Sequence, residues 1–439
     1  MKLEMRIPVS ILRQARDDLV RQHPFAFERV GFIFARHASS SGQVLILANR
    51  YEAVPDEDYV PDESVGARIG AAIIRRMLQT VLNRQEGIFH VHMHDHPGTP
   101  GFGLVDKREL AQLIPPFCAV ASKEHHGAVL LSRDRVICRA WSQGAAPIGV
   151  TRVSSVGYPL ETCCQETISM NPAERFSRQS FLGAESTQRI ASAQLAIVGV
   201  GGGGSHVVQQ LGHVGFTNLR LFDAQRVEDS NLNRLVGATE EDVTANRLKV
   251  DVAARLLLGL NREAQPQKIP SRWQEAADAL RECEIVIGCV DGFSERNELE
   301  AFARRHLMPY VDIGLDVHQV EGEPPQMAGQ VVLSMPGYPC MKCMGILSEA
   351  NLAREMARYG VAGPRPQVVW ANGVLGSLAV GVVVDLVTGW SSNLPLPLYL
   401  SFDANQGTVV PHVRLRFIRD RVCPHYSPEN VGAPRFTPL

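Results

Sequence analysis

The amino-acid sequence predicts an α/β protein with two domains, a mixed α/β domain followed by a doubly wound parallel sheet. Three observations support this fold class. At about 150 residues per domain, 439 residues are enough for two or three domains. The first third of the chain combines short strand-like runs with amphipathic helices. From Gln194 onward, fully apolar strands alternate with helices, which is typical of a parallel sheet covered on both faces.

The composition argues against several classes of function. Lys and Arg number 44 and Asp and Glu 46, a net charge of −2, so no overall field favours binding to nucleic acid or to an acidic membrane. Apolar residues make up 45% of the chain and charged residues 21%, as in an ordinary soluble globular protein. The nine cysteines are too few for a disulfide scaffold and the chain opens without an apolar leader, so we expect a cytoplasmic protein.

Residues 1–150 are expected to form the first domain, a mixed α/β unit. Two amphipathic helices are expected in it, at 11–20 and 65–82. Six strands are expected, at 31–36, 43–48, 88–92, 117–121, 128–132 and 136–140.

Residues 151–174 lose this periodicity and are expected to be a linker to a second domain at 175–439. Four short apolar runs of the second domain are typical of buried parallel strands, at 195–198, 219–222, 285–288 and 310–313. The longest apolar run, 368–387, contains Asp385, and burying a carboxylate in a bilayer is expensive. We therefore expect a helix buried inside the protein.

A glycine-rich loop lies between the first of these strands and a helix. Without β-carbons its backbone can approach a phosphate, and the N–H groups of the following helix point toward that phosphate. Asp223 ends the next strand, where a carboxylate can bind a ribose hydroxyl. These features predict a nucleotide site and fit an NAD-type Rossmann domain equally well. The glycines of the loop are Gly199, Gly201, Gly202, Gly203 and Gly204.

The residues after the second strand favour one nucleotide over the other. Ser230, Asn231 and Arg234 stand in one short segment, Lys249 opens a helix, and Asp291 follows a strand. A site for a dinucleotide such as NAD requires neither these cations nor an additional carboxylate around the phosphates. Attack on ATP needs cations on the departing pyrophosphate and an acid for Mg²⁺. The set therefore favours nucleotidyl transfer from ATP over an NAD-dependent oxidoreductase.

With these motifs in order, the chain from about Arg175 to its end resembles the ThiF/MoeB and ubiquitin-activating enzyme superfamily. The resemblance includes the segment that begins at Arg175 and the glycine motif from Gly373 to Leu378. Members of this superfamily adenylate the C-terminal carboxylate of ubiquitin-like proteins. The resemblance implies a Rossmann-like ThiF-type adenylyltransferase domain that uses ATP and Mg²⁺.

The resemblance also implies roles for single residues. Asp223 would hold the ribose and Asp291 would position the magnesium. Arg178 would reach in from the second subunit of a homodimer. Fixed cations in a dry site remove the repulsion between an attacking carboxylate and the α-phosphate. The residues that would neutralise the triphosphate are Asn231, Arg234 and Lys249.

Four residues of the second domain suggest a structural zinc site. Cys340 and Cys343 have the C-x-x-C spacing that lets two thiolates share one tetrahedral zinc, and Cys423 and His425 could complete it. The resembled family usually has a second C-x-x-C there, so His425 would be a substitution. The alternative is a pair of buried thiols.

Many relatives carry a cysteine that receives the activated acyl group. Residues 344–372, where that cysteine would stand, contain none. The resemblance therefore implies MoeB-like behaviour, in which the acyl group passes directly to an outside nucleophile.

The first domain has a histidine-rich strand. His94 and His96 alternate along it and so face the same side, and Asp106 at the start of a helix can complete a three-ligand zinc site open to water. His92 and His94 are an equally allowed pair, and a strand with solvated histidines is a further alternative. Such zinc is typical of hydrolysis, because it lowers the pKa of bound water from about 15.7 to about 7. Glu28 is the candidate carboxylate that takes up the proton.

Glu28 ahead of an apolar strand, the H-x-H-P motif and Asp106 resemble the JAMM metalloprotease family over roughly residues 5–145. Members of that family cut isopeptide or peptide bonds after ubiquitin-like C-termini, which implies a JAMM-like (deaminase-like) zinc isopeptidase domain. Two features depart from the family. The segment between His96 and Asp106 is one residue short, and Gly103 replaces the serine that supports the tetrahedral intermediate.

The sequence as a whole predicts a bifunctional enzyme. Its second domain would adenylate the C-terminal carboxylate of a ubiquitin-like protein, and its first would cleave after that C-terminus, to trim a precursor or reverse conjugation. In the resembled families such fusions occur in bacterial ubiquitin-like modification systems, some associated with defence against phage. The alternative is activation of a sulfur-carrier protein for thiamine or molybdopterin synthesis, with a first domain that binds without hydrolysing.

Overall fold

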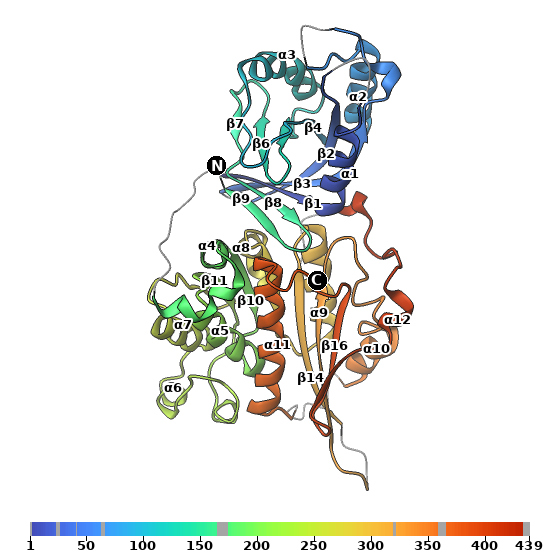
Figure 1. The fold of residues 1–439 in the computed structure, drawn as a ribbon. Coiled ribbons are helices and arrows are strands. Elements are labelled where there is room, and N and C mark those ends of the chain that lie inside the picture. Colours follow the sequence, from blue (N-terminus) through green and yellow to red (C-terminus); the bar gives the residue numbers. More distant parts are fainter. Residues whose placement is uncertain are drawn as a thin grey trace. The chain divides into compact units, whose positions relative to one another are not determined.

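The computed structural model describes residues 2–22, 27–40, 42–62, 66–164, 174–318, 322–358 and 366–432. The chain forms two compact units (Figure 1). The first consists of Met1–Gly157, Glu161–Thr167 and Ser427–Arg435, and the second of Tyr158–Leu160, Ile168–Tyr426 and Phe436–Leu439.

The first unit is built on a nine-stranded mixed sheet. Its strand order is β7-β6-β5-β4-β2-β3-β1-β8-β9, and β1 pairs in parallel with both β3 and β8. The strands are β1 (Lys2–Pro8), β2 (Val30–Ser39), β3 (Gln43–Ala53), β4 (Gly87–Met93), β5 (His126–Leu131), β6 (Val136–Trp141), β7 (Ile148–Gly149), β8 (Arg152–Val156) and β9 (Glu161–Cys164). The helices are α1 (Val9–Leu19), η1 (Asp56–Asp58), α2 (Ala71–Arg84), α3 (Leu104–Val120) and η5 (Pro428–Asn430).

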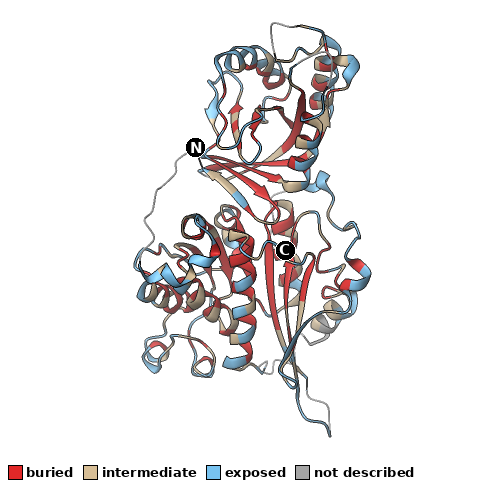
Figure 2. Cartoon of the chain, in the orientation of Figure 1, coloured by how far each residue is buried: buried red, intermediate tan, exposed pale blue. Residues whose placement is uncertain are grey.

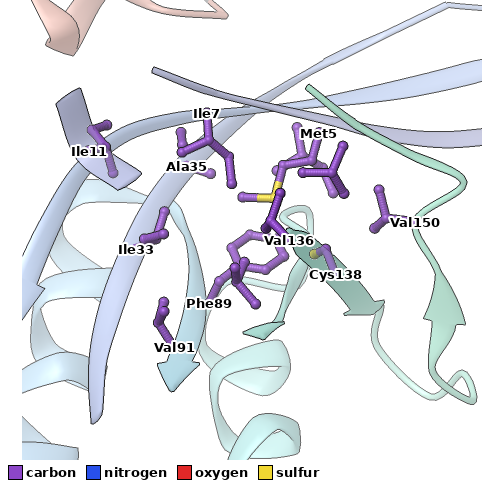
Figure 3. Packing of buried hydrophobic residues seen from close by; sticks show 14 of the residues in the cluster. Met5, Ile7, Ile11, Ile33, Ala35, Phe89, Val91, Val136, Cys138 and Val150 are labelled. Carbon is purple, nitrogen blue, oxygen red and sulfur yellow. The ribbon is translucent and has the colours of Figure 1, made fainter. Parts of the chain in front are cut away.

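Helices cover both faces of this sheet. On one face Ile11 and Leu12 of α1 pack with Ile33 and Phe89 of the strands, in the core that Figure 3 shows from close by. On the other face, side chains of α2 and α3 pack against alternate residues of β2 and β4, such as Ile88. Because successive side chains of a strand point to opposite faces, His90 and His92 share the α2 and α3 face with Ile88.

Two predictions for the first unit are wrong. The expected strand at 117–121 is instead the end of α3, because Leu110, Ile114, Phe117 and Cys118 repeat at helical spacing and are all buried. The expected linker at 151–174 contains β8 and β9, which extend the sheet beside β1. Residues 165–173 lie outside the described part of the chain. The first strand, β1, was not among the six expected.

The second unit contains an eight-stranded sheet in the order β12-β11-β10-β13-β14-β15-β16-β17. Strands β10 to β14 pair in parallel, and the last three are antiparallel. The strands are β10 (Gln194–Val198), β11 (Asn218–Phe222), β12 (Gln267–Ile269), β13 (Ile285–Gly288), β14 (Tyr310–His318), β15 (Gln326–Ser334), β16 (Leu398–Asp403) and β17 (Thr408–Pro411). The four expected parallel strands are confirmed.

Helices cover both faces of this sheet as well. Leu299 and Phe302 of α9 pack with Val198 and Val286, and the other face carries α5, α7 and α11. Figure 2 shows the strands between these layers as mostly buried. The helices are η2 (Glu174–Leu182), α4 (Ser186–Ser192), α5 (Gly202–Val214), η3 (Asp229–Asn231), α6 (Glu240–Thr244), α7 (Lys249–Leu260), η4 (Trp273–Ala276), α8 (Ala277–Arg281), α9 (Phe293–Arg305), α10 (Glu349–Arg358), α11 (Val369–Thr388) and α12 (Leu415–Ile418).

Helix α11 is long and apolar enough to cross a membrane, but 67% of its apolar window is buried inside the protein. It packs against α5, β14 and β15 (Figure 1), which accounts for its hydropathy without a bilayer. The carboxylate of Asp385 accepts hydrogen bonds from the hydroxyls of Tyr158 (2.9 Å) and Ser391 (2.6 Å). The expected buried helix is confirmed.

Candidate functional site

The glycine loop joins β10 to α5, and its conformation requires glycine. Gly199 has a φ of +86°, and a β-carbon on it would lie 2.7 Å from the carbonyl oxygen of Cys289. A β-carbon on Gly204 would lie 1.9 Å from the carbonyl oxygen of Gly199. Helix α5 begins at Gly202, so the unpaired N–H groups of its first turn lie in this loop and offer donors to an anion.

Asp223 follows β11 and is hydrogen-bonded to the glycine loop. Its carboxylate accepts the N–H of Val200 at 3.0 Å and the N–H of Gln225 at 2.8 Å. Burial raises the pKa of Asp223, the nearby Lys249 and the two N–H donors oppose that rise, and Asp291 adds to it. Lys249 and Asp291 therefore both lie close enough to Asp223 to change its pKa.

Lys249 is the first residue of α7 and is 8% exposed. Its ammonium donates a 2.6 Å hydrogen bond to the side-chain oxygen of Gln225. Asn231 is also buried, and its side-chain oxygen accepts the N–H of Glu228, so it stabilises the turn after β11. Ser230 is exposed on the same turn.

Three side chains from separate segments surround the first glycine of α5. A β-carbon on Gly202 would lie 2.6 Å from the side-chain nitrogen of Asn372, 3.1 Å from the side-chain oxygen of Gln367 and 3.3 Å from Cδ of Arg234. Gln367 also donates a 3.0 Å hydrogen bond to Asp291. The structure therefore places Arg234 next to the glycine loop and links Asp291 to it through Gln367.

Sequence reasoning missed three residues of this site, namely Gln225, Gln367 and Asn372. Gln225 and Gln367 lie outside helices and strands. Asn372 lies in the apolar helix α11, directly before the Gly373 motif. A polar residue in so apolar a helix was the one signal that could have identified Asn372.

Arg178 does not join the other residues within this chain. It is exposed on η2, whose neighbours Phe176 and Gln179 contact Gly215 and Val214 at the C-terminal end of α5. The glycine loop lies at the other end of that helix, about 18 Å away at 1.5 Å per residue. The role predicted for Arg178 depends on a second subunit and stays a prediction.

A second group of polar residues lies in the first unit. Ligand atoms of His92, His94 and Asp106 all lie within 4.8 Å of one another, with His92 Nε2 3.5 Å and His94 Nε2 4.0 Å from the carboxylate. The contact with His92 is the main cause that lowers the pKa of Asp106 to about 2. His92 is 4% exposed, and among the described residues its Nδ1 has no hydrogen-bond partner and its Nε2 has only the long contact with Asp106. These ring nitrogens fit a metal ion.

His96 does not belong to this group. The expected pair of His94 and His96 is therefore corrected to the alternative pair, His92 and His94. Strand β4 ends at Met93, and the N–H of His96 bonds the carbonyl of His94 at 2.9 Å, so the chain turns between them. His96 is exposed and its Nδ1 lies 2.8 Å from the carbonyl oxygen of Pro97. The N–H of His94 still bonds the carbonyl of Leu131 at 3.0 Å, so the alternation of β4 extends from His92 to His94 but not to His96.

Glu28 lies on a segment next to the histidines. Val30 of β2 pairs with His92 of β4, and Glu28 lies in a bend two residues before Val30, with its carboxylate next to Gly66, where an added β-carbon would lie 2.9 Å from it. The N–H of Glu28 bonds the carbonyl of Gly66 at 2.9 Å. Gly103 precedes α3, and its N–H donates to the carboxylate of Asp106 at 2.7 Å.

The four predicted ligands of the structural zinc converge. Sγ of Cys340 lies 3.7 Å from Sγ of Cys343 and 3.3 Å from Nδ1 of His425, and Sγ of Cys343 lies 3.9 Å from Sγ of Cys423. A tetrahedral zinc with ligand distances of about 2.0–2.3 Å sets its ligand atoms about 3.5–3.8 Å apart. The spacing therefore fits zinc. All nine cysteines are unbridged.

Comparison with known proteins identifies the second unit. The model of the ThiF family matches residues 175–424, more than half of the chain. The chain belongs to the ThiF family. The matched ThiF region contains the glycine loop, Asp223, Lys249, Asp291 and Asn372, whereas His92 and its neighbours lie outside it.

Several curated proteins resemble this ThiF chain. The SAMP-activating enzyme E1 of Haloferax volcanii is 28% identical over 211 residues, which cover 46% of this chain and 74% of that protein. The sulfur carrier protein ThiS adenylyltransferase of Escherichia coli K12 is 28% identical over 222 residues, covering 49% and 81%. The molybdopterin-synthase adenylyltransferase of the same strain is 27% identical over 223 residues, covering 49% and 82%.

Among solved structures, E. coli MccB with succinimide is 22% identical, with a TM-score of 0.47, and covers 58% of this chain and 74% of its own.

Proposed function

We propose that the second unit adenylates the C-terminal carboxylate of a ubiquitin-like or sulfur-carrier protein. A carboxylate oxygen would attack the α-phosphorus of ATP, pyrophosphate would leave, and a mixed anhydride with AMP would remain. The observation that carries this proposal is the grouping of Arg234, Lys249, Asp223 and Asp291 around the N-terminus of α5. Two cations at a helix N-terminus favour phosphate oxygens, and a dry, fixed site makes them effective.

Each residue has a role in this proposal. The backbone N–H groups of Gly202 and its neighbours bind phosphate oxygens, and Asp223 accepts a ribose hydroxyl. Arg234 and Lys249 neutralise the charge that develops on the pyrophosphate. Asp291 would hold Mg²⁺, which supplies further charge neutralisation on the phosphates. Arg178 of a second subunit would complete the site.

Sulfur-carrier activation is the better-supported form of this function. Two of the relatives are named as adenylyltransferases, one of the sulfur carrier protein ThiS and one of molybdopterin synthase. Neither name refers to the attachment of a modifier to other proteins. The absence of cysteine from residues 344–372 favours direct transfer of the acyl group from the adenylate.

Mass spectrometry of the carrier tests this proposal. Candidate ubiquitin-like and sulfur-carrier proteins are incubated with ATP, Mg²⁺ and this protein, and we expect an AMP adduct on the C-terminal residue of one of them. The matched control is the same carrier with an amidated C-terminus, which offers no carboxylate nucleophile. An adduct on the amidated carrier, or none on any carrier, would contradict the proposal. Covalent conjugates in cells would favour the modification pathway over sulfur transfer.

A second candidate function rests on the ring nitrogens of His92. We propose that His92, His94 and Asp106 hold a zinc ion, and that the first unit cleaves after the C-terminus of the same carrier. Bound zinc would supply an activated water. Glu28, which precedes the strand that pairs with the histidine strand, would take a proton from that water and pass it to the leaving amine. Gly103 offers no side-chain hydroxyl to the tetrahedral intermediate, so we expect slow cleavage.

Glu28→Gln separates hydrolysis from binding. The variant is expected to keep its zinc and its affinity for the carrier and to lose cleavage of a carrier with a C-terminal extension, because the amide cannot accept the proton. If wild-type protein loaded with zinc leaves every extended carrier intact, the first unit is a binding module, as in the sulfur-carrier alternative.

We further propose that Cys340, Cys343, Cys423 and His425 hold a structural zinc ion with no role in chemistry. The backbone around the first two ligands is fixed by buried Glu300, which accepts the N–H of Met341 at 2.7 Å. Four protein ligands leave no open position for substrate or water, which is typical of structural sites.

A further inference from the structure

Asn372 carries a buried amide group that the ThiF unit itself does not satisfy. The residue is 4% exposed, in the first turn of α11, and its side-chain nitrogen has no hydrogen-bond acceptor among the residues that the structure describes. Its backbone N–H already bonds the carbonyl of Val368 at 3.3 Å, so the residue lies inside the helix and does not cap it. An unpaired buried amide is costly, so its retention calls for an explanation.

The amide lies against the first glycines of α5. Its nitrogen would be 2.6 Å from a β-carbon on Gly202, and its oxygen 3.7 Å from one on Gly203. It therefore borders the space that the missing side chain of Gly202 leaves open. The unpaired N–H groups of the first turn of α5 lie in the same place. Cδ of Arg234 would lie 3.3 Å from the same β-carbon, while Nη1 of its guanidinium donates to the carbonyl of Ser230 and to the side-chain oxygen of Asn233.

The chemistry of these groups selects one class of ligand. Amide N–H groups, helix N–H groups and a guanidinium are all donors, so the group that completes them must offer several acceptor oxygens and negative charge. A phosphate meets both conditions. Gln367 presents its oxygen near Gly202 but directs its own amide to Asp291, so it supplies no competing donor there.

We propose that Asn372 is a nucleotide-binding residue whose side-chain N–H₂ donates to a phosphate oxygen at the glycine loop. This inference rests on the proposed ATP-dependent function and adds to it a donor from α11. The unpaired amide of the nucleotide-free protein then becomes paired when the phosphate binds, so the cost of burying it is recovered on binding.

Two substitutions distinguish binding from a structural role. Asn372→Leu keeps the volume and removes the donor, and Asn372→Asp keeps the shape and places a carboxylate near the phosphate. Affinities for ATP, AMP and adenosine are measured by calorimetry or by competition with a fluorescent nucleotide, and unfolding temperatures are measured without nucleotide. The control is Ser377→Ala on the same helix, where the hydroxyl is exposed and bonds Gln210 and the carbonyl of Gly373.

We expect Asn372→Leu to weaken ATP binding by about 10- to 100-fold, because hydrogen bonds to charged groups are the stronger kind, and Asn372→Asp to weaken it further. Adenosine, which has no phosphate, is expected to bind all three proteins alike. The leucine variant is expected to unfold at the same or a higher temperature than wild type, because an unpaired buried amide has been removed.

Three results would overturn the inference: unchanged ATP affinity in both variants, an equal loss for adenosine and ATP, or a leucine variant that unfolds well below wild type. If that variant does not fold, Asn372→Asp, which changes no heavy-atom count, gives the same comparison of ATP with adenosine. Failure of the wild-type protein to bind ATP is a separate outcome, which refutes the proposed function itself and removes the basis of this inference with it.

Discussion

The carboxylate of Asp223 accepts the backbone N–H of Val200 at 3.0 Å, across the gap between the ends of β11 and β10. A second hydrogen bond joins it to Gln225, whose side chain in turn accepts the ammonium of Lys249 at 2.6 Å. Residues from three separate segments of the sequence thus form one chain of contacts from the glycine loop to α7. The acid and the cation are held in place by the protein itself, which is the preorganisation that electrostatic catalysis requires.

Gln225→Leu tests this chain of contacts. The substitution removes the acceptor that holds Lys249 but keeps the charge, so we expect adenylation to fall by about tenfold. Lys249→Met removes the charge itself and is expected to cost at least 100-fold, as loss of a donor to a developing negative charge typically does. Lys268→Met is the control, because Lys268 is half exposed and pairs with Asp251. Equal activity of Gln225→Leu and wild type would show that Lys249 needs no such support.

Metal content distinguishes the two histidine pairs. We expect wild-type protein to bind two zinc ions, His92→Ala to bind one, and His96→Ala to keep both, since only His92 belongs to the converging group. Elemental analysis of the purified variants measures this directly. If His96→Ala loses a zinc ion and His92→Ala keeps both, the ligand pair is His94 and His96, which contradicts the assignment of His92 and His94.

Removal of the zinc ion that we propose at Cys340, Cys343, Cys423 and His425 is expected to lower stability and leave the first-unit site unaffected. Cys340→Ser should lose one zinc ion and lower the unfolding temperature of the second unit by about 5 °C or more, because structural zinc contributes directly to folding. The control is Cys164→Ser, since Cys164 is exposed and lies on β9 of the first unit. An unchanged unfolding temperature in Cys340→Ser would indicate two buried thiols.

An ion pair between exposed Arg255 and the buried carboxylate of Asp242 makes stability depend on pH. The Arg255 guanidinium beside Asp242 holds the pKa of that carboxyl well below its ordinary value of 3.8, and the carboxyl is 1% exposed. Because the pKa is lower in the folded state, the stabilisation is fully present above the unfolded pKa and is lost as the pH falls below it. Asp242→Asn should therefore cost about 2 kcal/mol at pH 7 and less at pH 3.

Urea unfolding of both proteins at pH 7 and pH 3 measures this difference. Asp251→Asn serves as the matched control, because the side chain of Asp251 is 30% exposed against 1% for Asp242, and exposed pairs contribute about 0–1 kcal/mol. A penalty for Asp242→Asn that is the same at both pH values would contradict the predicted role of the ion pair.

Local sequence predicted the parts of the nucleotide site that depend on local geometry. The loop that starts at Gly199, the acid at the end of β11 and the lysine that opens α7 follow from strand ends and helix starts. Gln367 and Asn372 could not be predicted in this way. Their roles come from contacts with Gly202, which lies far from them in the sequence. Tertiary packing of α11 against α5 creates those contacts.

The histidine pair shows the same limit in the first unit. Alternation along a strand allowed either His92 and His94 or His94 and His96 as the ligand pair. The position at which β4 ends decides between the two pairs. The wrong strand at 117–121 has a related cause, since a short apolar run suits a buried helix as well as a strand. Only the continuous packing of α3, from Leu110 to Phe117, separates the two.

Carrier-dependent exchange of pyrophosphate into ATP tests the central claim most directly. Wild-type protein with the correct ubiquitin-like or sulfur-carrier protein is expected to catalyse exchange, because formation of the adenylate is reversible. Asp291→Ala is expected to lower it by at least 100-fold, because the substitution removes the carboxylate that we propose holds Mg²⁺. Exchange at the wild-type rate in Asp291→Ala would contradict the assigned site, and absence of exchange from wild type with every carrier would contradict the proposed adenylation.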